Sequence, residues 1–226
     1  MDALTNSLTA AILASGAYDP LPSKEELSRF SHLFAVDGGL IACHQLSLTP
    51  HLFIGDFDSC PKNLLTLYPH VEKKLYPKDK DYSDLELALQ IALERGFRKA
   101  VAFGALGKRL DHSIYNLQLL LKFPLLTSLK NGYEEVFLIQ RETVLSCIPG
   151  QTLSLFSLFE PAEGVSTKGC KWELQNVCLN HLFMSLSNEA NSHKVHIQCQ
   201  KGPLFCCLQN PLKKVSSSLY NIDKAQ

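Results

Sequence analysis

The chain has 226 residues, of which 46% are hydrophobic and 19% are charged. This length and composition allow one large domain or two modest ones with real cores, and they exclude disordered, collagen-like and disulfide-scaffold proteins. Lysine and arginine together number 22, as do aspartate and glutamate, so the formal net charge is zero. Because no basic surplus is available to neutralise a phosphate backbone, we do not expect a nucleic-acid partner.

The first apolar run, from Leu8 to Ala17, predicts a buried strand rather than a secretion signal, because no lysine or arginine precedes Lys24. No stretch approaches the roughly 18 to 20 uninterrupted apolar residues of a membrane span. The expectation is therefore a soluble, cytoplasmic protein without a membrane partner.

Short apolar runs alternate with helix-length amphipathic segments between residue 8 and about residue 140. This alternation predicts an α/β domain in which helices connect the strands of a mostly parallel sheet and cover both of its faces. The fourth run carries three charged residues, which indicates a more exposed strand. The predicted strands are Thr9–Ala14, His32–Val36, His51–Ile54, Val71–Leu75, Lys99–Phe103 and Glu135–Ile139.

Two helix starts carry the S-x-x-E pattern of a capping box, Ser23 with Glu26 and Ser83 with Glu86. In that motif the hydroxyl and the carboxylate each satisfy a backbone donor at the helix N-terminus. The segment after Ser83 has a broad apolar face, and a further helix is predicted over residues 110–122.

Past about residue 142 the pattern changes to strand-length apolar runs separated by turn residues. Examples are Thr152–Phe159, Val195–Gln200 and Leu204–Leu208. We therefore predict an all-β second domain, with the division between residues 1–141 and residues 142–226.

The eight cysteines include no C-x-x-C pair, so we interpret them as reduced and mostly buried thiols. Cys170, Cys178 and His181 are close enough in sequence to suggest a metal-ligand set. Without a second close-spaced pair, packing in the core is the favoured interpretation.

Polar loops follow four of the predicted strands, at the edge where an open parallel sheet binds ligands. These loops are residues 37–39, 55–59, 78–84 and 104–112. Aspartate, glycine and serine are common in turns, so each loop alone has an ordinary explanation. Together the loops supply six carboxylates whose mutual repulsion favours a bound cation, and oxygen ligands favour Mg²⁺ over zinc. The six are Asp37, Asp56, Asp58, Asp81, Asp84 and Asp111.

Basic residues and glycines stand beside these acids, among them Lys80, Lys108 and Arg109. Acids for Mg²⁺, together with bases and backbone amides for phosphate oxygens, indicate a nucleoside-triphosphate site. The loop from Gly104 is not a Walker A sequence, because only two residues separate Gly104 from Gly107. A GTPase-type P-loop is thereby excluded, and the absence of G-x-G-x-x-G counts against a nicotinamide enzyme.

Five motifs occur in the order and spacing of one family. They are VDGG at 36–39, GDFDS at 55–59, KDYSDLELAL at 80–89, FGALGKRLDHSIYNLQLL at 103–120 and SLSNE at 185–189. On these motifs the chain resembles thiamine pyrophosphokinase (thiamine diphosphokinase) in its bacterial form, from the first strand to about residue 208. The resemblance implies a Rossmann-like nucleotide-binding domain followed by a C-terminal all-β sandwich domain. It also implies a homodimer, with thiamine bound near the subunit interface.

The activity implied by the resemblance is transfer of the pyrophosphoryl group of ATP to the hydroxyl of thiamine, with Mg²⁺ as cofactor. The products are thiamine diphosphate and AMP. The expected metal ligands are Asp56, Asp58, Asp81 and Asp84. The expected ATP-binding residues are Asp37, Gly38, Gly55, Lys80, Gly104, Lys108 and His112. The expected catalytic residues are Asp58, Asp84, Arg109 and Asp111, and the expected thiamine-binding residues are Asp111, Ser187 and Asn188.

Several roles stay open at the level of the sequence. Asp111 is the first candidate for a general base, with the alternative that it caps a helix beginning at His112 and orients Arg109. Trp172, the only tryptophan, is expected to be a buried aromatic, and stacking on thiamine is the alternative. Lys108 stands where many relatives of the resembled family carry glycine, which leaves the base that contacts phosphate unassigned.

Two other functions compete with the one that the resemblance implies. The first is a Mg²⁺-dependent phosphotransferase or phosphohydrolase that uses the same carboxylates on another substrate. The second is a non-catalytic sensor of a nucleotide or of thiamine. Acids retained on all four loops argue against a sensor, because a sensor could bind its ligand without the full metal set.

Overall fold

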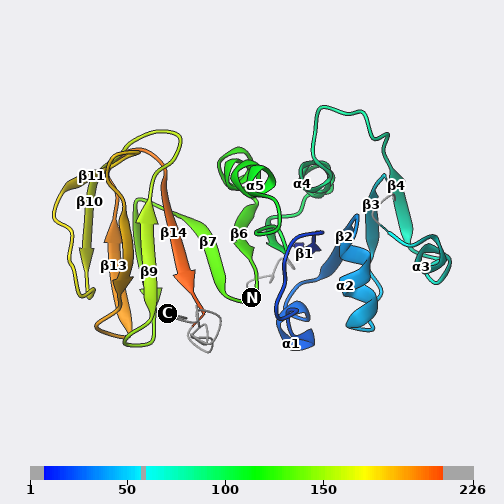
Figure 1. Cartoon of the computed structure of the whole chain (residues 1–226), viewed down its shortest axis with the longest axis horizontal. Helices are drawn as coiled ribbons and strands as arrows, with labels where there is room; N and C mark the ends of the chain where they lie inside the picture. The colour runs from blue at the N-terminus through cyan, green and yellow to red at the C-terminus, as the bar shows by residue number, and fades with distance from the viewer. Residues whose placement is uncertain (1–7, 57–59, 211–226) are drawn as a thin grey trace, which may run out of the picture. The chain divides into compact units, whose positions relative to one another are not determined.

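The computed structural model describes residues 8–56 and 60–210. Asp58, expected to be a metal ligand and catalytic residue, lies outside the described residues. The chain divides into two compact units, with the boundary in sequence between Leu138 and Ile139. Figure 1 shows the α/β unit from blue to green and the second unit from green to orange.

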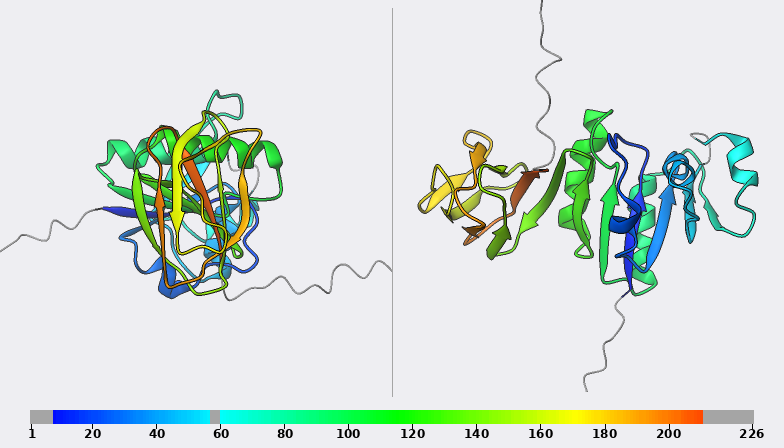
Figure 2. Two further views of the ribbon diagram at one scale, coloured as in Figure 1. Left: turned by 90° about the vertical axis from the view of Figure 1, so that its left-hand side faces the viewer. Right: turned by 90° about the horizontal axis from the view of Figure 1, so that it is seen from below.

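The sheet of the first unit has the strand order β7-β6-β5-β1-β2-β3-β4. Neighbouring strands from β6 to β4 are parallel, and β7 runs antiparallel to β6. Figures 1 and 2 show these strands side by side in a twisted sheet. The strands are β1 (Thr9–Leu13), β2 (His32–Val36), β3 (Leu52–Gly55), β4 (Glu72–Leu75), β5 (Lys99–Phe103), β6 (Leu126–Lys130) and β7 (Glu134–Ile139). The mostly parallel α/β sheet predicted from the alternating pattern is confirmed.

The strand β6 was not predicted from the sequence. Its run Leu126–Lys130 mixes apolar and polar residues, so it lacks the continuous hydrophobicity of β1 or β5. A tight turn connects β6 to β7, in which Asn131 Oδ1 accepts hydrogen bonds from the backbone N–H groups of Tyr133 and Glu134 at 2.8 and 3.0 Å. The exposed character predicted for the fourth strand is confirmed, because all four residues of β4 are exposed at the end of the sheet.

Helices cover both faces of this sheet (Figure 1). The helices are α1 (Lys24–Leu27), α2 (Gly39–Gln45), α3 (Lys62–Thr66), α4 (Asp84–Glu94) and α5 (Leu110–Lys122). Buried residues of α1, α2 and α3 share one cluster with alternate strand residues such as Ala11, Ala35 and Val101. Strand residues alternate in direction, so residues such as Ile12 and Phe34 point to the opposite face, which α4 covers.

Each of the two predicted capping boxes forms the hydrogen bond of its serine but not that of its glutamate. Ser23 Oγ accepts from the backbone N–H of Glu26 at 3.0 Å, and Ser83 Oγ accepts from that of Glu86 at 3.2 Å. The glutamate carboxylates do not complete the motif, because they bind tertiary partners instead. Glu26 accepts from Lys130 Nζ at 2.8 Å, and the fully buried Glu86 binds side chains of α5.

Two glycines allow close backbone approach at the carboxyl ends of the strands. A Cβ on Gly16 would lie 2.1 Å from the carbonyl oxygen of Gly104, and a Cβ on Gly39 would lie 1.9 Å from that of Leu13. Gly16 N–H also donates to Gly104 O at 2.7 Å. These contacts bring the loops after β1, β2 and β5 together, which is where the site forms.

The second unit consists of antiparallel strands, as predicted. In one sheet β9 pairs with both β12 and β14, and the other sheet has the order β11-β10-β13-β8. Its strands are β8 (Glu142–Ser146), β9 (Thr152–Phe156), β10 (Ala162–Lys168), β11 (Val177–Leu179), β12 (Ser185–Glu189), β13 (Lys194–Gln198) and β14 (Leu204–Gln209). Inward residues such as Leu153, Val165 and Ile197 are buried, and Phe156 stacks on Phe205 with ring centroids 5.5 Å apart.

All eight cysteines are free thiols, and six of them are buried. This agrees with the interpretation of reduced, mostly buried thiols. Among the described residues, no helix combines the length and the apolar character that crossing a membrane requires.

Candidate active site

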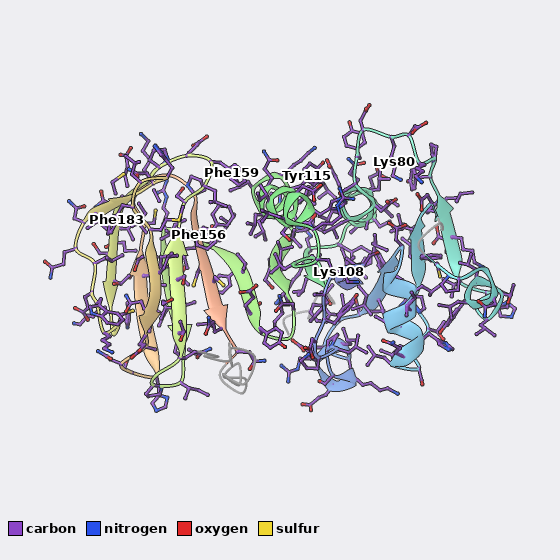
Figure 3. All side chains as sticks on the ribbon, viewed as in Figure 1. Lys80, Lys108, Tyr115, Phe156, Phe159 and Phe183 are labelled. Carbon is purple, nitrogen blue, oxygen red and sulfur yellow. The ribbon has the colours of Figure 1, made fainter. Side chains whose placement is uncertain are left out.

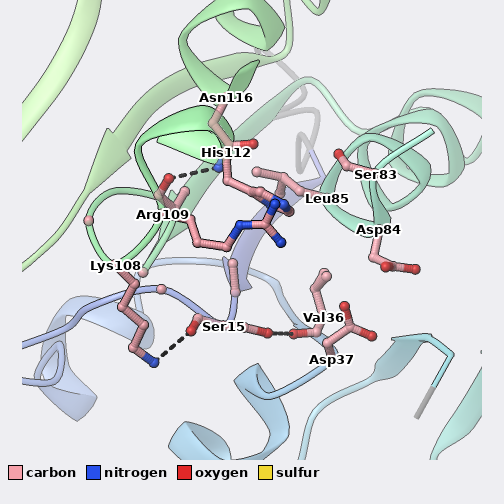
Figure 4. A pocket seen from close by; sticks show the side chains of 15 residues that line it. Ser15, Val36, Asp37, Ser83, Asp84, Leu85, Lys108, Arg109, His112 and Asn116 are labelled. Atoms are coloured by element: carbon pink, nitrogen blue, oxygen red, sulfur yellow. Dashed lines mark hydrogen bonds between the residues drawn. The ribbon is translucent and has the colours of Figure 1, made fainter. Parts of the chain in front are cut away.

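A pocket of about 320 Å³ lies at the carboxyl ends of the parallel strands (Figure 4). Four segments line it: the loop after β1, the loop after β2, the start of α4, and the loop from β5 into α5. Of the residues expected at the site, it brings together Asp37, Asp84, Gly104, Lys108, Arg109 and His112.

Among the lining residues that the sequence did not single out as site residues are two polar ones, Ser15 and Asn116. Ser15 follows β1, and its Oγ accepts from the backbone N–H of Gly38 at 2.9 Å. Asn116 lies one turn after His112 on α5 and donates through Nδ2 to Ala105 O at 2.7 Å. The spacing of four residues between His112 and Asn116 was the available signal, because it places both on one helix face.

The acidic side of the pocket is formed by Asp37 and Asp84. Neither Asp37 Oδ1 nor Asp84 Oδ1 has a hydrogen-bond partner, although both atoms are buried. Lys80 Nζ lies 3.1 Å from Asp84 Oδ1 as an ion pair between two largely buried side chains. A Cβ on Gly55 would lie 1.8 Å from Asp37 Oδ1, so only glycine leaves room for this carboxylate. One lysine therefore faces two crowded carboxylates.

This crowding affects the titration of Asp37. Burial, followed by the charge and hydrogen bonding of Asp84 and the charge of Asp56, raises the pKa of Asp37 from 3.8 to about 7. Lys80 acts in the opposite direction but does not compensate. The ionised form of Asp37 is thus costly at neutral pH unless a cation joins the site.

The donor set fits a hard cation. Carboxylate oxygens are ligands that Mg²⁺ prefers, and two buried carboxylate oxygens here lack hydrogen bonds. Within residues 8–56 and 60–210, no group of three or more histidine, cysteine, aspartate or glutamate side chains is already arranged as a metal site. The residues present therefore supply part of a coordination shell, and phosphate oxygens or water would supply the rest.

The remaining expected metal ligands differ in position. Asp56 is half-buried and close enough to Asp37 to raise its pKa. Asp81 is exposed and does not line the pocket.

The basic side of the pocket comes from the loop after β5. Lys108 adopts a left-handed backbone conformation with φ +61°, and its Nζ donates to Ser15 O at 2.9 Å (Figure 4). A left-handed lysine is uncommon, since this region favours glycine. The conformation places the ammonium group at the edge of the pocket, beside the loop after β1.

Arg109 and Asp111 form a two-point ion pair. Arg109 Nε donates to Asp111 Oδ1 at 3.1 Å, and a terminal nitrogen donates to Oδ2 at 2.5 Å. These hydrogen bonds hold the pKa of Asp111 below its ordinary value, which weakens it as a base. Helix α5 begins at Leu110, so Asp111 lies in its first turn and does not cap a helix starting at His112. The pair favours the role of orienting Arg109.

The second unit carries the other expected residues, Ser187 and Asn188. Asn188 is buried, and both of its hydrogen bonds to Trp172 go to the backbone. Its Oδ1 accepts from the backbone N–H of Trp172 at 3.1 Å, and its Nδ2 donates to the backbone carbonyl oxygen of Trp172 at 2.7 Å. Asn188 therefore anchors the segment that carries Trp172. Ser187 is exposed and has a left-handed conformation with φ +54°.

The expectation that Trp172 is buried is wrong, because 54% of the side chain is exposed. Lys171 Nζ lies 4.5 Å from the centroid of its ring, on one face. A single aromatic residue that follows glycine, cysteine and lysine carries no periodicity, so its exposure could not be derived from the sequence pattern. An exposed indole held by Asn188 suits ligand stacking better than core packing.

Two family models match the chain. One is described as "Thiamin pyrophosphokinase, catalytic domain" and covers residues 23–131, and the other as "Thiamin pyrophosphokinase, vitamin B1 binding domain" and covers residues 138–204. "Thiamin pyrophosphokinase 1" from Caenorhabditis elegans is 27% identical over 188 residues, which are 74% of this chain and 74% of that relative. "Thiamine pyrophosphokinase" from Bacillus subtilis is 32% identical over 117 residues, which are 50% of this chain and 55% of that relative.

The crystal structure of thiamine pyrophosphokinase from Bacillus subtilis shares the fold, with a TM-score of 0.78 and 23% identity. The match covers 89% of this chain and 99% of that one. Fold and pocket thus define a class of enzymes in which an α/β unit precedes an antiparallel β unit. Within that class, the chain belongs to the thiamin pyrophosphokinase family, whose members are ATP-dependent enzymes.

Proposed function

We propose that this protein is a thiamine diphosphokinase, which transfers the pyrophosphoryl group of Mg²⁺-bound ATP to the hydroxyl of thiamine. The observation that carries the proposal is the pocket of the first unit, where two buried carboxylate oxygens without hydrogen bonds, only one of them paired with a lysine, face the bases of the β5–α5 loop. Acids that take a cation and bases that take phosphate oxygens are the two requirements of phosphoryl-group transfer. The catalytic-domain match covers the same segment of the chain.

Asp84 and Asp56 of the expected set, together with Asp37, would hold the Mg²⁺ ion, and Asp58 and Asp81 remain part of the proposal. When bound, Mg²⁺ neutralises charge on the phosphate oxygens of ATP. Lys80 holds the Asp84 carboxylate at 3.1 Å and limits the repulsion between the acids. Gly55 leaves the space that Asp37 occupies.

Lys108 and Arg109 offset the negative charge that develops on the transferred group and on the leaving AMP. Asp111 orients Arg109 through two hydrogen bonds. The hydroxyl of thiamine attacks the β-phosphorus, the bond between the α- and β-phosphates breaks, and the hydroxyl proton leaves to solvent. Positioning and electrostatics supply most of the rate in such a transfer, so no dedicated general base is assigned.

The second unit supplies the vitamin site in this proposal. Trp172 offers an exposed aromatic face, Ser187 an exposed hydroxyl, and Asn188 anchors the Trp172 segment. The match to a vitamin B1 binding domain supports this assignment. We extend the proposal to a cytoplasmic homodimer, in which thiamine binds near the subunit interface. The eight free thiols are consistent with a reducing compartment.

Purified protein incubated with Mg²⁺ and ATP, with and without thiamine, tests the proposal. Thiamine-dependent AMP, formed one for one with thiamine diphosphate, is the expected result. Formation of ADP or thiamine-independent phosphate release would support the phosphotransferase or phosphohydrolase alternative. Saturable ATP binding without turnover would instead indicate a sensor.

A further inference from the structure

Glu86 is a fully buried carboxylate outside the pocket. Its side chain has 0% exposure, yet it lies in the first turn of α4, where glutamate is usually solvated. Its carboxylate accepts hydrogen bonds from Tyr115 Oη and Lys122 Nζ, both on α5. Burial and this contact with Glu86 raise the pKa of Tyr115 to about 12, so the tyrosine stays a hydrogen-bond donor at neutral pH.

The sequence context makes this arrangement informative. Glu86 is the third residue of α4, with Ser83 at the N-cap, and a capping box would use its carboxylate at the helix end. The structure instead directs the carboxylate to a neighbouring helix. Burying a carboxylate is costly, and an apolar residue would join two helices without that cost. A buried carboxylate held by donors of a second helix can offset that cost by fixing the geometry between the two helices.

The two helices that Glu86 joins carry opposite sides of the pocket. Asp84 is the first residue of α4 and lies two residues before Glu86. Tyr115 lies between His112 and Asn116 on α5, both of which line the pocket. Figure 3 shows Tyr115 on α5, on the same side of the sheet as α4. Glu86 and Tyr115 therefore lie within about one helical turn of the groups that face the ligand, and Lys122 extends the link toward the far end of α5.

We propose that Glu86 is a positioning residue: bound by Tyr115 and Lys122, it fixes the first turn of α4 against α5. It thereby sets the position of Asp84 relative to His112 and Arg109. Two donors from different turns of α5 constrain both the rotation and the translation of α4, which a single contact would not do. This inference rests on the proposed function, because Asp84 is placed there as a ligand of the metal and its nucleotide.

The test compares Glu86→Gln, Tyr115→Phe and Lys122→Gln with a matched control, Glu94→Gln, at the exposed end of the same helix. For Glu86→Gln we expect kcat to fall roughly 10- to 100-fold, since small displacements of a reacting geometry have effects of that size. Tyr115→Phe and Lys122→Gln should lower kcat less, in the same direction. Lys122→Arg, which keeps a charged donor, should restore kcat to within about twofold of wild type.

If Glu86 had a structural role alone, its substitution would lower the unfolding temperature and leave kcat and the KM for thiamine unchanged. We therefore measure kcat per folded protein, the KM for thiamine and the thermal unfolding of each variant. Variants that unfold at lower temperature but keep kcat within about twofold would overturn the proposal. If Glu86→Gln does not fold, the two α5 variants decide the question by the same criterion.

Failure of the proposed function is recognised separately. If wild-type protein forms no thiamine diphosphate, the reaction is wrong, and equilibrium binding of a Mg²⁺-bound, non-hydrolysable ATP analogue becomes the readout. Binding weakened roughly tenfold by Glu86→Gln but not by Glu94→Gln would still support the positioning role. Equal binding by both variants would refute it.

Discussion

Asp37→Asn is expected to stabilise the metal-free protein at alkaline pH. The substitution keeps the shape of the side chain and removes its charge, and asparagine tolerates the left-handed conformation of this residue, φ +47°. A pKa of about 7 against an ordinary 3.8 corresponds to roughly 4 kcal/mol of cost for the ionised form above pH 7. Solvent reaches part of this half-buried carboxylate, so we take about half of that figure, roughly 2 kcal/mol.

The sign follows from proton binding. The raised pKa means that folded wild type binds more protons than unfolded chain between about pH 4 and pH 7, so wild-type stability falls as pH rises through that range. Asparagine does not titrate, and the advantage of the variant should therefore be small below about pH 4 and complete above about pH 7. For a chain of this length, about 2 kcal/mol corresponds to a shift of roughly 4 to 8 °C.

Thermal unfolding of both proteins from pH 4 to pH 8, without and with Mg²⁺, is the assay. Mg²⁺ should raise the unfolding temperature of wild type at pH 8 and have little effect on Asp37→Asn, because a ligand stabilises only the state that binds it. Asp79→Asn, an exposed residue of the β4–α4 loop, is the control and should change neither behaviour. Equal unfolding temperatures of wild type and Asp37→Asn at pH 8 would refute the argument that this carboxylate is strained without a cation.

Three further predictions concern the two sites and one surface ion pair. Asn188→Ala should release the Trp172 segment, so the KM for thiamine should rise about tenfold while the KM for ATP stays within about twofold. Steady-state kinetics with each substrate varied, and Asn191→Ala as the control, measure this; an effect confined to the KM for ATP would contradict the assignment to the thiamine site. Lys108→Gly replaces a residue with a left-handed backbone by the residue that tolerates it, so the free energy of unfolding should stay within about 1 kcal/mol of wild type while ATP binding weakens in calorimetry. An unchanged affinity for ATP would show that Lys108 does not contact the phosphates. Glu72→Gln breaks an exposed two-point ion pair with Arg95, which holds the pKa of Glu72 below its ordinary value. Urea unfolding should show that the variant loses at most about 1 kcal/mol of unfolding free energy at pH 7, and that this loss vanishes as pH falls through the lowered pKa. A loss that is the same at all pH values would contradict this origin.

The sequence predicted the α/β sheet well where local pattern and burial agree. Runs such as residues 100–103 of β5 are apolar throughout because helices cover both faces of the sheet, and that pattern can be recognised without knowing which residues pack against the strand. The gathering of Asp37, Asp84 and Lys108 at one edge followed from the rule that loops after parallel strands meet there. The strand β6 was not predicted because its polar residues interrupt the run of apolar residues that marks a buried strand. Its other neighbour, β7, runs antiparallel to it, which the βα alternation of the sequence does not indicate.

Side-chain partners were harder to predict, because they depend on tertiary contacts. Ser23–Glu26 and Ser83–Glu86 have the same spacing, yet neither glutamate carboxylate binds at its own helix end. Glu26 accepts from a residue 104 positions away, and Glu86 accepts from residues 29 and 36 positions away. The exposure of Trp172 depends on how Asn188 holds its segment, across 16 residues. The roles of the individual site residues remain predictions, and the variants above address them.

The most direct test of the central claim is the fate of the β-phosphate of ATP. Protein supplied with Mg²⁺, thiamine and ATP labelled at the β-phosphorus should transfer the label into thiamine diphosphate and release unlabelled AMP, with no label in ADP. This result requires that the attacked atom is the β-phosphorus and that both terminal phosphates move together. Label retained in ADP, with thiamine carrying at most one phosphate, would contradict pyrophosphoryl transfer.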